Sequence, residues 1–550
     1  MTAQLSDLDL HVISGAMPAG IHGEMVISAP VIDDRLSYQL FGFGALVRLS
    51  LTPGTFGAPA DAHALRYRVI DTPVYRLHQR APEAFHGSLL GFDTPWGAPN
   101  MANTAPLAFD GRLMATWDVG RPVEVDPVTL GFIAEVGRQQ SWGGGSFGKT
   151  TPLPQVFSSA HPVVDPERGW LWTVKLVLSA QGMQPWVVKY RGDGGDVSMW
   201  PIEGAAVLGS MHTIAQTRNW LVMADSGNFK ADPGEIMGGT RTVTIDETVP
   251  VYLVRKDDID NTPPGEPLQS ICMRIGPTTG HYYAVWDDSD GIRVLFEHMD
   301  LTDLGYRLEP GDVDVYGQPV NPVHLGMYQM AMASQTLSEW ILHPATASAQ
   351  RSAHAAGADR FNLQLSAQDW SLEGQSDPTH HHVVFQGFRG GALAQRTLDI
   401  YADRIDRSSY PDRDQKASLV TFTRGDLQVS SQYRFPNDHD LPSSPSFVPR
   451  PGGTPGGGDG WVVLPVLSDD GFRVEIFDAA DVGRGPVATL APRTAHRFPF
   501  ILHSIWMPEV THAPDLDRNR FSDDLDDDLV ASLDDGARAL LLDVAAELDG

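Results

Sequence analysis

The sequence of 550 residues has a single cysteine, Cys272, and far fewer basic than acidic residues. One cysteine excludes an internal disulfide and any zinc cluster built on cysteines, and it fits a reducing compartment. Lys and Arg number 40 against 69 Asp and Glu, which gives a formal net charge of −29. A phosphate backbone is bound by clustered cations. We therefore expect no nucleic-acid partner.

Two kinds of apolar segment are also missing. The first twenty residues, MTAQLSDLDLHVISGAMPAG, contain no basic leader followed by an apolar run, which is the pattern of a secretory signal. No later run approaches the roughly 20 apolar residues that a membrane-spanning helix needs. We expect a cytoplasmic protein whose membrane contact, if any, is peripheral. The sequence gives no indication of an oligomeric state.

Long helical periodicity is scarce before residue 530, and short β-type segments recur instead. Examples are GALVRLSL, GWLWTVKLVL, VPVYLVRKDD and ASLVTFTRGD, with DPERG, DDSDG and SDDG as reversals between such segments. Asp and Gly at these positions are typical of tight turns between antiparallel strands. With many short strands and no strand–helix alternation, the sequence predicts an all-β fold. We favour a β-propeller, because closing a ring of sheets leaves few exposed edges.

We expect one β-propeller domain over residues 1–514 and an acidic tail over 515–550. The tail ends in DDGARALLLDVAAEL, a segment with apolar residues at helical spacing. These residues are Ala537, Leu540, Leu541, Val544, Ala545 and Leu548. The spacing predicts a short amphipathic helix that docks one face on the body.

Four of the nineteen histidines stand in apolar or strand-like settings beside turns. They are His161, His212, His281 and His503. If each lies at the inner end of a strand, four neutral imidazoles from different sheets would meet on the propeller axis. Such a site suits a divalent ion such as Fe(II) and leaves positions open for dioxygen or substrate.

Several ordered motifs resemble those of the carotenoid cleavage oxygenases. SSAHPVVDPERG and MHTIAQTRNWLVMAD are similar to two histidine motifs of that family, and NTAPLAFDGRLMATWDVGRPVEVDPVTLG resembles a region before them. A C-terminal stretch from PSFVPRPGG to FPFILHSIWMP follows the family almost continuously. The resemblance implies a seven-bladed propeller with axial Fe(II) held by four histidines. It also implies cleavage of an alkene bond of a carotenoid, apocarotenoid or stilbene by O2, which gives two carbonyl products.

The resemblance assigns three ligands to the iron: His161, His212 and His503. The third ligand in chain order is contested between His281 and His298. His281 stands in HYYAVWDDSDGIRV, where Trp286 and Asp287 match the aromatic–acidic pair of the family pattern. His298 lies one strand later, so we favour His281. We expect no catalytic residue beyond the metal ligands.

The chain departs from the family pattern around the histidines. The family hydrogen-bonds three of its imidazoles to glutamates, and these positions hold Asp118, Tyr401 and Ser444 here. Residues 501, 502 and 504 are Ile, Leu and Ser, where the family usually has Gly, Phe and Gly. Losing a partner of a metal ligand typically lowers metal affinity or activity by about 10- to 100-fold. We therefore expect weaker iron retention than in a member with three glutamates.

One position bears on the substrate. The hydroxystilbene-cleaving branch of the family tends to carry a Lys just before the first of the three acids, where this chain has Trp117. This favours a carotenoid or apocarotenoid-like substrate, although Lys149 could supply a cation from elsewhere. Two alternatives stay open: a stilbene- or phenylpropenoid-cleaving oxygenase, and a catalytically impaired propeller that binds an apolar ligand or a partner protein.

Overall fold

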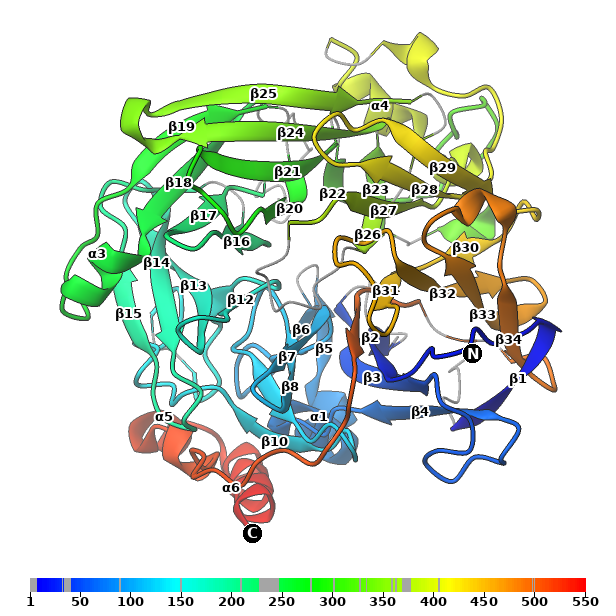
Figure 1. Ribbon diagram of the computed structural model, residues 1–550. Helices are drawn as coiled ribbons and strands as arrows, with labels where there is room; N and C mark the ends of the chain where they lie inside the picture. The colour runs from blue at the N-terminus through cyan, green and yellow to red at the C-terminus, as the bar shows by residue number, and fades with distance from the viewer. Residues whose placement is uncertain are drawn as a thin grey trace.

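The computed structural model shows sheets standing side by side around a common centre, each built of antiparallel strands (Figure 1). It describes the following residues: 7–31, 33, 41–88, 91–148, 151–207, 210–226, 247–276, 279–299, 302–325, 328–332, 334–357, 360–361, 364–367, 377–403, 406–496, 498 and 500–550. The all-β prediction and the propeller-like arrangement are confirmed.

Among the residues that the structure describes, five sheets of four or five strands form separate blades. We number these blades in chain order. The first blade contains β7 (Ala105–Phe109), β8 (Arg112–Thr116), β9 (Val123–Val125) and β10 (Phe132–Glu135), and the second contains β11 (Phe157–Ser158), β12 (Val163–Asp165), β13 (Trp170–Ser179), β14 (Gly182–Tyr190) and β15 (Ser198–Pro201). The third contains β16 (Ile214–Gln216), β17 (Trp220–Ala224), β18 (Val249–Arg255) and β19 (Ile271–Ile275); the fourth contains β20 (Thr279–Ala284), β21 (Ile292–Met299), β24 (Gln335–His343) and β25 (Ser348–Ala355); and the fifth contains β26 (Gln364–Ala367), β27 (His380–Phe385), β28 (Ser418–Thr423) and β29 (Val429–Arg434).

The expectation of seven separate blades is not met in the part of the chain that the structure describes. Ten strands that would suffice for two blades form one continuous sheet, because β1 pairs with β34 on one side and β4 on the other. The members of this sheet are β1 (Leu8–Gly15), β2 (Glu24–Val31), β3 (Phe43–Ser50), β4 (His63–Val69), β30 (Leu441–Pro442), β31 (Ser446–Pro449), β32 (Gly460–Ser468), β33 (Gly471–Asp478), β34 (Ala488–Pro492) and β35 (Ser504–Met507). This sheet therefore joins the first strands of the chain to the last.

The described residues also form two short two-stranded sheets and a few helices outside the blades. The two sheets pair β5 (His86–Ser88) with β6 (Gly91–Asp93) and β22 (Thr302–Arg307) with β23 (Tyr328–Met332). The helices are α1 (Pro73–Arg80), α3 (Lys256–Asn261), α4 (Gln395–Ile400), α5 (Asp527–Ala531) and α6 (Asp535–Asp549). No helix among the ranges given above is both long enough and apolar enough to cross a bilayer.

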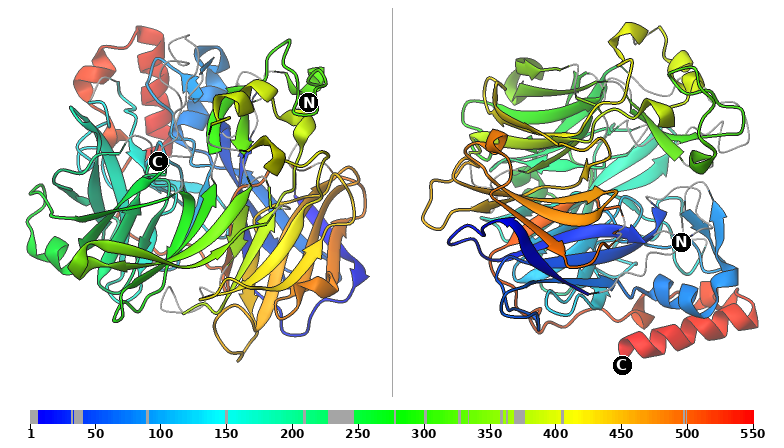
Figure 2. Two further views of the ribbon diagram at one scale, coloured as in Figure 1. Left: turned by 90° about the horizontal axis from the view of Figure 1, so that it is seen from above. Right: turned by 90° about the vertical axis from the view of Figure 1, so that its right-hand side faces the viewer.

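The C-terminal tail lies against the body of the protein beside α1 (Figure 2). Asp534 caps α6 by accepting a hydrogen bond from the backbone N–H of Ala537, as is usual for an aspartate at a helix N-terminus. Leu541 and Val544 are fully buried in a cluster with Leu77 of α1, and Trp96 Nε1 donates to the carbonyl oxygen of Ala537 at 2.9 Å. One face of α6 is thus docked through apolar contacts.

Apolar side chains fill the space between neighbouring blades. Between the second and third blades, Trp172 and Val174 of β13 pack in one cluster with Leu221 of β17 and Val254 of β18. Fully burying such a side chain stabilises the fold by about 1.5–3 kcal/mol. The turns between strands are set locally: in DPERG, Asp165 Oδ1 accepts from the backbone N–H groups of Glu167 and Arg168. The packing holds the blades in place, and their inner ends carry the site.

Candidate metal centre

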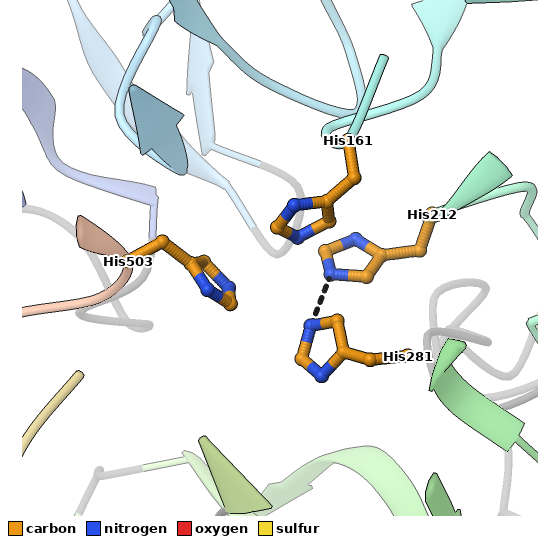
Figure 3. Close-up of side chains that lie close together, drawn as sticks. All are labelled: His161, His212, His281 and His503. Carbon is orange, nitrogen blue, oxygen red and sulfur yellow. Dashed lines mark hydrogen bonds between the residues drawn. The ribbon is translucent and has the colours of Figure 1, made fainter. Parts of the chain in front are cut away.

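The structure brings the four predicted histidines together at the centre of the ring of sheets (Figure 3). They are His161, just before β12; His212, just before β16; His281, in β20; and His503, just before β35. One ring nitrogen of each lies within 4.8 Å of those of the others. Ligand atoms on opposite sides of an imidazole-bound metal ion lie about 4 Å apart. The cluster therefore has the dimensions of a metal site.

Hydrogen bonds join the segments that carry the histidines. His161 N donates to His212 O at 3.1 Å, and Thr213 Oγ1 donates to Gly280 O at 3.3 Å. These bonds connect the second, third and fourth blades at their inner ends. His503 is held by β2, because Ser28 N donates to its carbonyl oxygen at 2.9 Å.

Two of the imidazoles contact carboxylates. His212 Nδ1 lies 2.8 Å and 3.0 Å from the two oxygens of Asp118. His281 Nδ1 lies 3.1 Å from Glu297 Oε2 on the adjacent strand β21. Ser366 Oγ donates to the other oxygen of Glu297 at 2.6 Å. Since a carboxylate only accepts hydrogen bonds, both Nδ1 atoms must carry the proton.

With the proton on Nδ1, the other ring nitrogen of each imidazole, Nε2, is free of a proton and can bind a metal ion. In a neutral imidazole with Nδ1–H, the Nε2 atom carries a lone pair. The Nε2 atoms of His212 and His281 face each other at 3.2 Å (dashed line in Figure 3), so two lone pairs are opposed. In addition, His161 Nε2 is buried and meets no hydrogen-bond partner among the residues that the structure places. A shared cation resolves both features, and the donor set therefore fits a metal ion.

The electrostatics keep the site in its metal-binding form. Burial, followed by the neighbouring imidazoles, holds the pKa of His161 and of His503 well below the ordinary value of 6.5. Burial disfavours the Glu297 carboxylate, but hydrogen bonds from His281 and His381 lower its pKa to about 2. Neutral imidazoles beside an ionised carboxylate are the protonation states that metal binding needs.

We predict that the metal-free protein loses stability as the pH falls below about 6.5. His161 and His503 stay neutral in the folded state but take up protons when the chain unfolds. Each therefore lowers the free energy of unfolding by about 1.4 kcal/mol per pH unit on the acid side. Urea unfolding of metal-free protein between about pH 7.5 and 5.5 measures this slope. The His503→Gln variant should show a shallower slope, and an equal slope would contradict the prediction.

The other predicted residues are distributed as follows. His298 lies on β21, buried, with its ring stacked on Phe296, and the cluster contains His281 in its place. Tyr401 follows α4 in the connection from β27 to β28 and packs with Phe361 and Phe388.

Ser444 contacts the residue that follows His503. The Ser504 hydroxyl donates to Ser444 Oγ at 3.1 Å and shares a 2.8 Å hydrogen bond with Ser446. Ile501 is fully buried in the core of the ten-stranded sheet. The Ser at 504, where the family has Gly, thus takes part in a hydroxyl cluster beside the last histidine.

Glu297 is the residue that the sequence analysis missed. Resemblance to the family directed attention to positions 118, 401 and 444, and Glu297 is none of these. A local signal was present, however. Counting back from the DDSDG reversal pairs Tyr282 with Phe296, and the next step places His281 beside Glu297. An acid within the apolar strand IRVLFEHM indicates a buried partner.

Comparison with known proteins agrees with the site. The family model described as retinal pigment epithelial membrane protein, RPE65, matches residues 2–508. The chain belongs to this family, the carotenoid cleavage oxygenases. Membership accounts for both the four-histidine cluster and the propeller-like fold.

Two curated members of the carotenoid cleavage oxygenase family align over most of the chain. The apocarotenoid-15,15'-oxygenase of Synechocystis is 39% identical over 529 residues, which cover 90% of this chain and 92% of that protein. The chloroplastic carotenoid cleavage dioxygenase 8 homolog A of Oryza sativa is 23% identical over 543 residues, covering 90% and 84%. Among solved structures, the lignostilbene dioxygenase of Pseudomonas brassicacearum superposes with a TM-score of 0.61 at 17% identity, covering 92% and 96%.

Proposed function

We propose that the protein is a non-haem Fe(II) dioxygenase that cleaves an alkene double bond of a carotenoid or apocarotenoid-like substrate. Both atoms of O2 enter the products, which are two carbonyl compounds. The observation that carries this proposal is the convergence of four imidazoles, two of them bonded to carboxylates, in a chain of this family. His161, His212, His281 and His503 would hold the iron.

The chain's own groups set the charge and orientation of the site. Four neutral imidazoles leave the charge of a divalent ion uncompensated, and burying such a charge is costly. The carboxylates of Asp118 and Glu297 supply two negative charges next to His212 and His281. They also fix the Nδ1–H tautomer, so that Nε2 points to the centre. Bound iron supplies the redox chemistry with dioxygen, and no side-chain acid or base is assigned a role.

The tryptophan at position 117 supports an apolar substrate. Its side chain is buried in an apolar cluster that includes Phe43 and Met101, with the Phe41 ring edge-on at 6.4 Å. No cation stands at this position to engage a phenolic oxygen. Lys149, which could supply one, lies outside the described residues. The similarity to the Synechocystis apocarotenoid-15,15'-oxygenase supports the same preference.

The test is aerobic turnover by iron-loaded protein. With an apocarotenal we expect loss of the polyene absorption and the appearance of two carbonyl products by mass spectrometry. Iron-free protein is the control. Cleavage of a hydroxystilbene in preference to the polyene would assign the protein to the stilbene-cleaving alternative. If iron binds stoichiometrically but neither substrate reacts, the non-catalytic alternative is favoured. That alternative is motivated by Ser444, whose hydroxyl group stands where the family has a glutamate.

A further inference from the structure

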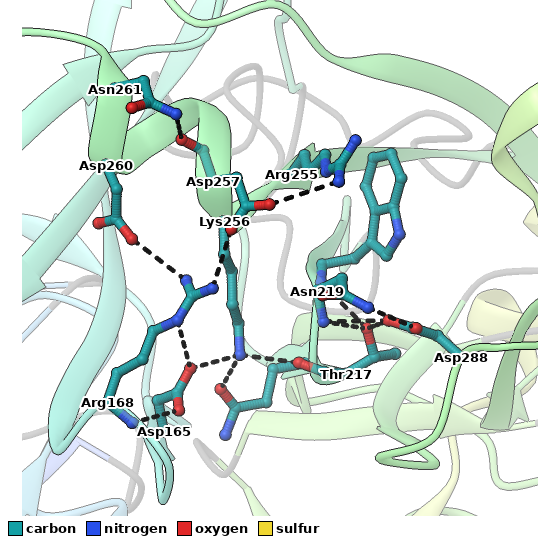
Figure 4. A network of polar contacts seen from close by, with 12 residues as sticks. Asp165, Arg168, Thr217, Asn219, Arg255, Lys256, Asp257, Asp260, Asn261 and Asp288 are labelled. Atoms are coloured by element: carbon teal, nitrogen blue, oxygen red, sulfur yellow. Dashed lines mark hydrogen bonds and ion pairs between the residues drawn. The ribbon is translucent and has the colours of Figure 1, made fainter.

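A buried lysine outside the metal centre joins three blades. Lys256, the first residue of α3, has no exposed side-chain surface. Its ammonium group donates to Asp165 Oδ2 at 2.6 Å, to Gln216 Oε1 at 2.9 Å and to Thr217 O at 2.7 Å (Figure 4). An ammonium group has three N–H donors, and all three are therefore used. Nζ also lies 4.8 Å from the centre of the Trp286 ring.

The groups around Lys256 belong to the three segments that carry His161, His212 and His281. Asp165 follows His161 by four residues along β12, Gln216 follows His212 by four along β16, and Trp286 follows His281 by five. At roughly 3.3 Å per residue in a strand, each segment runs about 13–17 Å from its histidine to the lysine. The Lys256 side chain thus contacts all three segments at the ends away from the metal centre, while their other ends carry the clustered histidines.

A second set of bonds reinforces the far ends. Asp288, two residues after Trp286, accepts from Thr217 Oγ1 at 2.5 Å and from Asn219 Nδ2 at 2.8 Å. Arg168, three residues after Asp165, pairs with Asp257 and Asp260 of α3 at 3.1 and 3.4 Å. The near ends are fixed by the backbone bond from His161 to His212 and by the hydroxyl bond from Thr213 to Gly280 described above. A segment held at both ends cannot pivot about either one.

We propose that Lys256 is a positioning residue of the metal centre, which sets the relative orientation of three blades and thereby the spacing of His161, His212 and His281. This inference rests on the proposed metal-binding function. Lys256 does not touch the histidines and acts through the strands. Its burial lowers its pKa to about 8, against the charge of Asp165, so the interaction stabilises the fold only while the lysine is protonated. Metal affinity is accordingly expected to depend on this remote side chain.

The chain offers a matched control. Lys175 is also buried, and burial likewise lowers its pKa to about 8. Its ammonium group donates to the carbonyl oxygens of Trp142 and Gly144, which belong to a single loop. Removing Lys175 therefore costs a buried, hydrogen-bonded lysine without releasing any of the segments that carry the histidines.

The experiment is a titration of metal-free protein with Co(II), a spectroscopic probe whose visible absorption reports coordination geometry. The variants are Lys256→Met, the double variant Lys256→Met/Asp165→Asn, and Lys175→Met. The double variant removes both charges of the pair, so that it folds even where Lys256→Met alone leaves the buried Asp165 carboxylate without its nearest cation. We expect the double variant to bind Co(II) about 10-fold more weakly, with an altered spectrum. Lys175→Met should stay within about twofold of the unmodified protein and keep its spectrum.

The outcomes separate this inference from the proposed function. If the unmodified protein binds Co(II) and the double variant binds it with equal affinity and an identical spectrum, the positioning role is overturned and the metal site stands. An equal weakening in Lys175→Met would also overturn it, since the effect would then be general destabilisation. If the unmodified protein binds no Co(II), the proposed function and the positioning role fail together.

Discussion

Replacing His281 by alanine is expected to abolish stoichiometric iron binding, whereas replacing His298 leaves iron binding intact. His281 contributes a ring nitrogen to the four-histidine cluster, while His298 is buried one strand away against Phe296. Without His281 the site keeps three imidazoles, and the buried Glu297 carboxylate loses its hydrogen bond from His281 Nδ1, a loss that destabilises the fold as well. The measurement is iron per folded chain after loading with ferrous salt and removal of excess metal.

The His298→Ala variant is the matched control, because it also removes a buried imidazole from the same hairpin. It will lower the midpoint of thermal unfolding, since it creates a cavity, but its folded fraction should carry as much iron as the unmodified protein. Loss of iron from His298→Ala together with retention in His281→Ala would make His298 the ligand in place of His281 and would contradict the proposed four-histidine site.

Replacing Glu297 by glutamine is expected to speed the loss of iron by about 10- to 100-fold. Glutamine has the same shape, so its amide oxygen can still accept from His281 Nδ1 while its NH2 group faces Ser366. What disappears is the negative charge, which the low pKa of Glu297 shows to be present at all ordinary pH values. With Asp118 alone, half of the compensation for a divalent ion is gone. The measurement is iron remaining during dialysis against a chelator.

Glu339→Gln is the control for this experiment. Glu339 is a buried glutamate on β24, the strand next to β21, and it contacts Arg424 and Ser352. Its replacement alters the same blade without touching the cluster, so iron should be lost at the unmodified rate. The unmodified protein should itself lose some iron during the dialysis, and faster than a family member with three glutamates, because the carboxylates of Asp118 and Glu297 contact two of its four imidazoles. Full iron occupancy after prolonged dialysis of Glu297→Gln would remove the compensating role from this residue.

The sequence was sufficient to predict the strands, the clustering of the four histidines and the position of Asp118 near one of them, but not Glu297 beside His281. Asp- and Gly-rich reversals such as DPERG form through local bonds of Asp165, and local bonds leave a local signal. The choice of His281 over His298 followed from the distance to an aromatic–acidic pair, and the geometry of the cluster agrees with it. Glu297 was not predicted, because resemblance to the family points only to the family's own glutamate positions. The contact between Glu297 and His281 depends instead on how β20 pairs with β21.

The blade count differed from expectation for a related reason. Whether two neighbouring groups of strands remain separate depends on what lies between them. Here β1 pairs with β34 and with β4, and these partners come from opposite parts of the chain. No short-range pattern in LDLHVISG encodes a pairing of that kind. The role of Lys256 is similarly invisible in the sequence, since Asp165, Gln216 and Trp286 meet it only after three blades have assembled.

The joining of the first and last strands in one sheet has a consequence for biosynthesis. His503 is placed by Ser28 of β2, so the fourth imidazole reaches the centre only once the ribosome has passed that codon and β35 has found β2. Earlier intermediates hold at most three imidazoles and an open ring. If the cluster holds iron as proposed, a nascent or prematurely terminated chain lacks one of its four ligands, and loading with the metal follows translation.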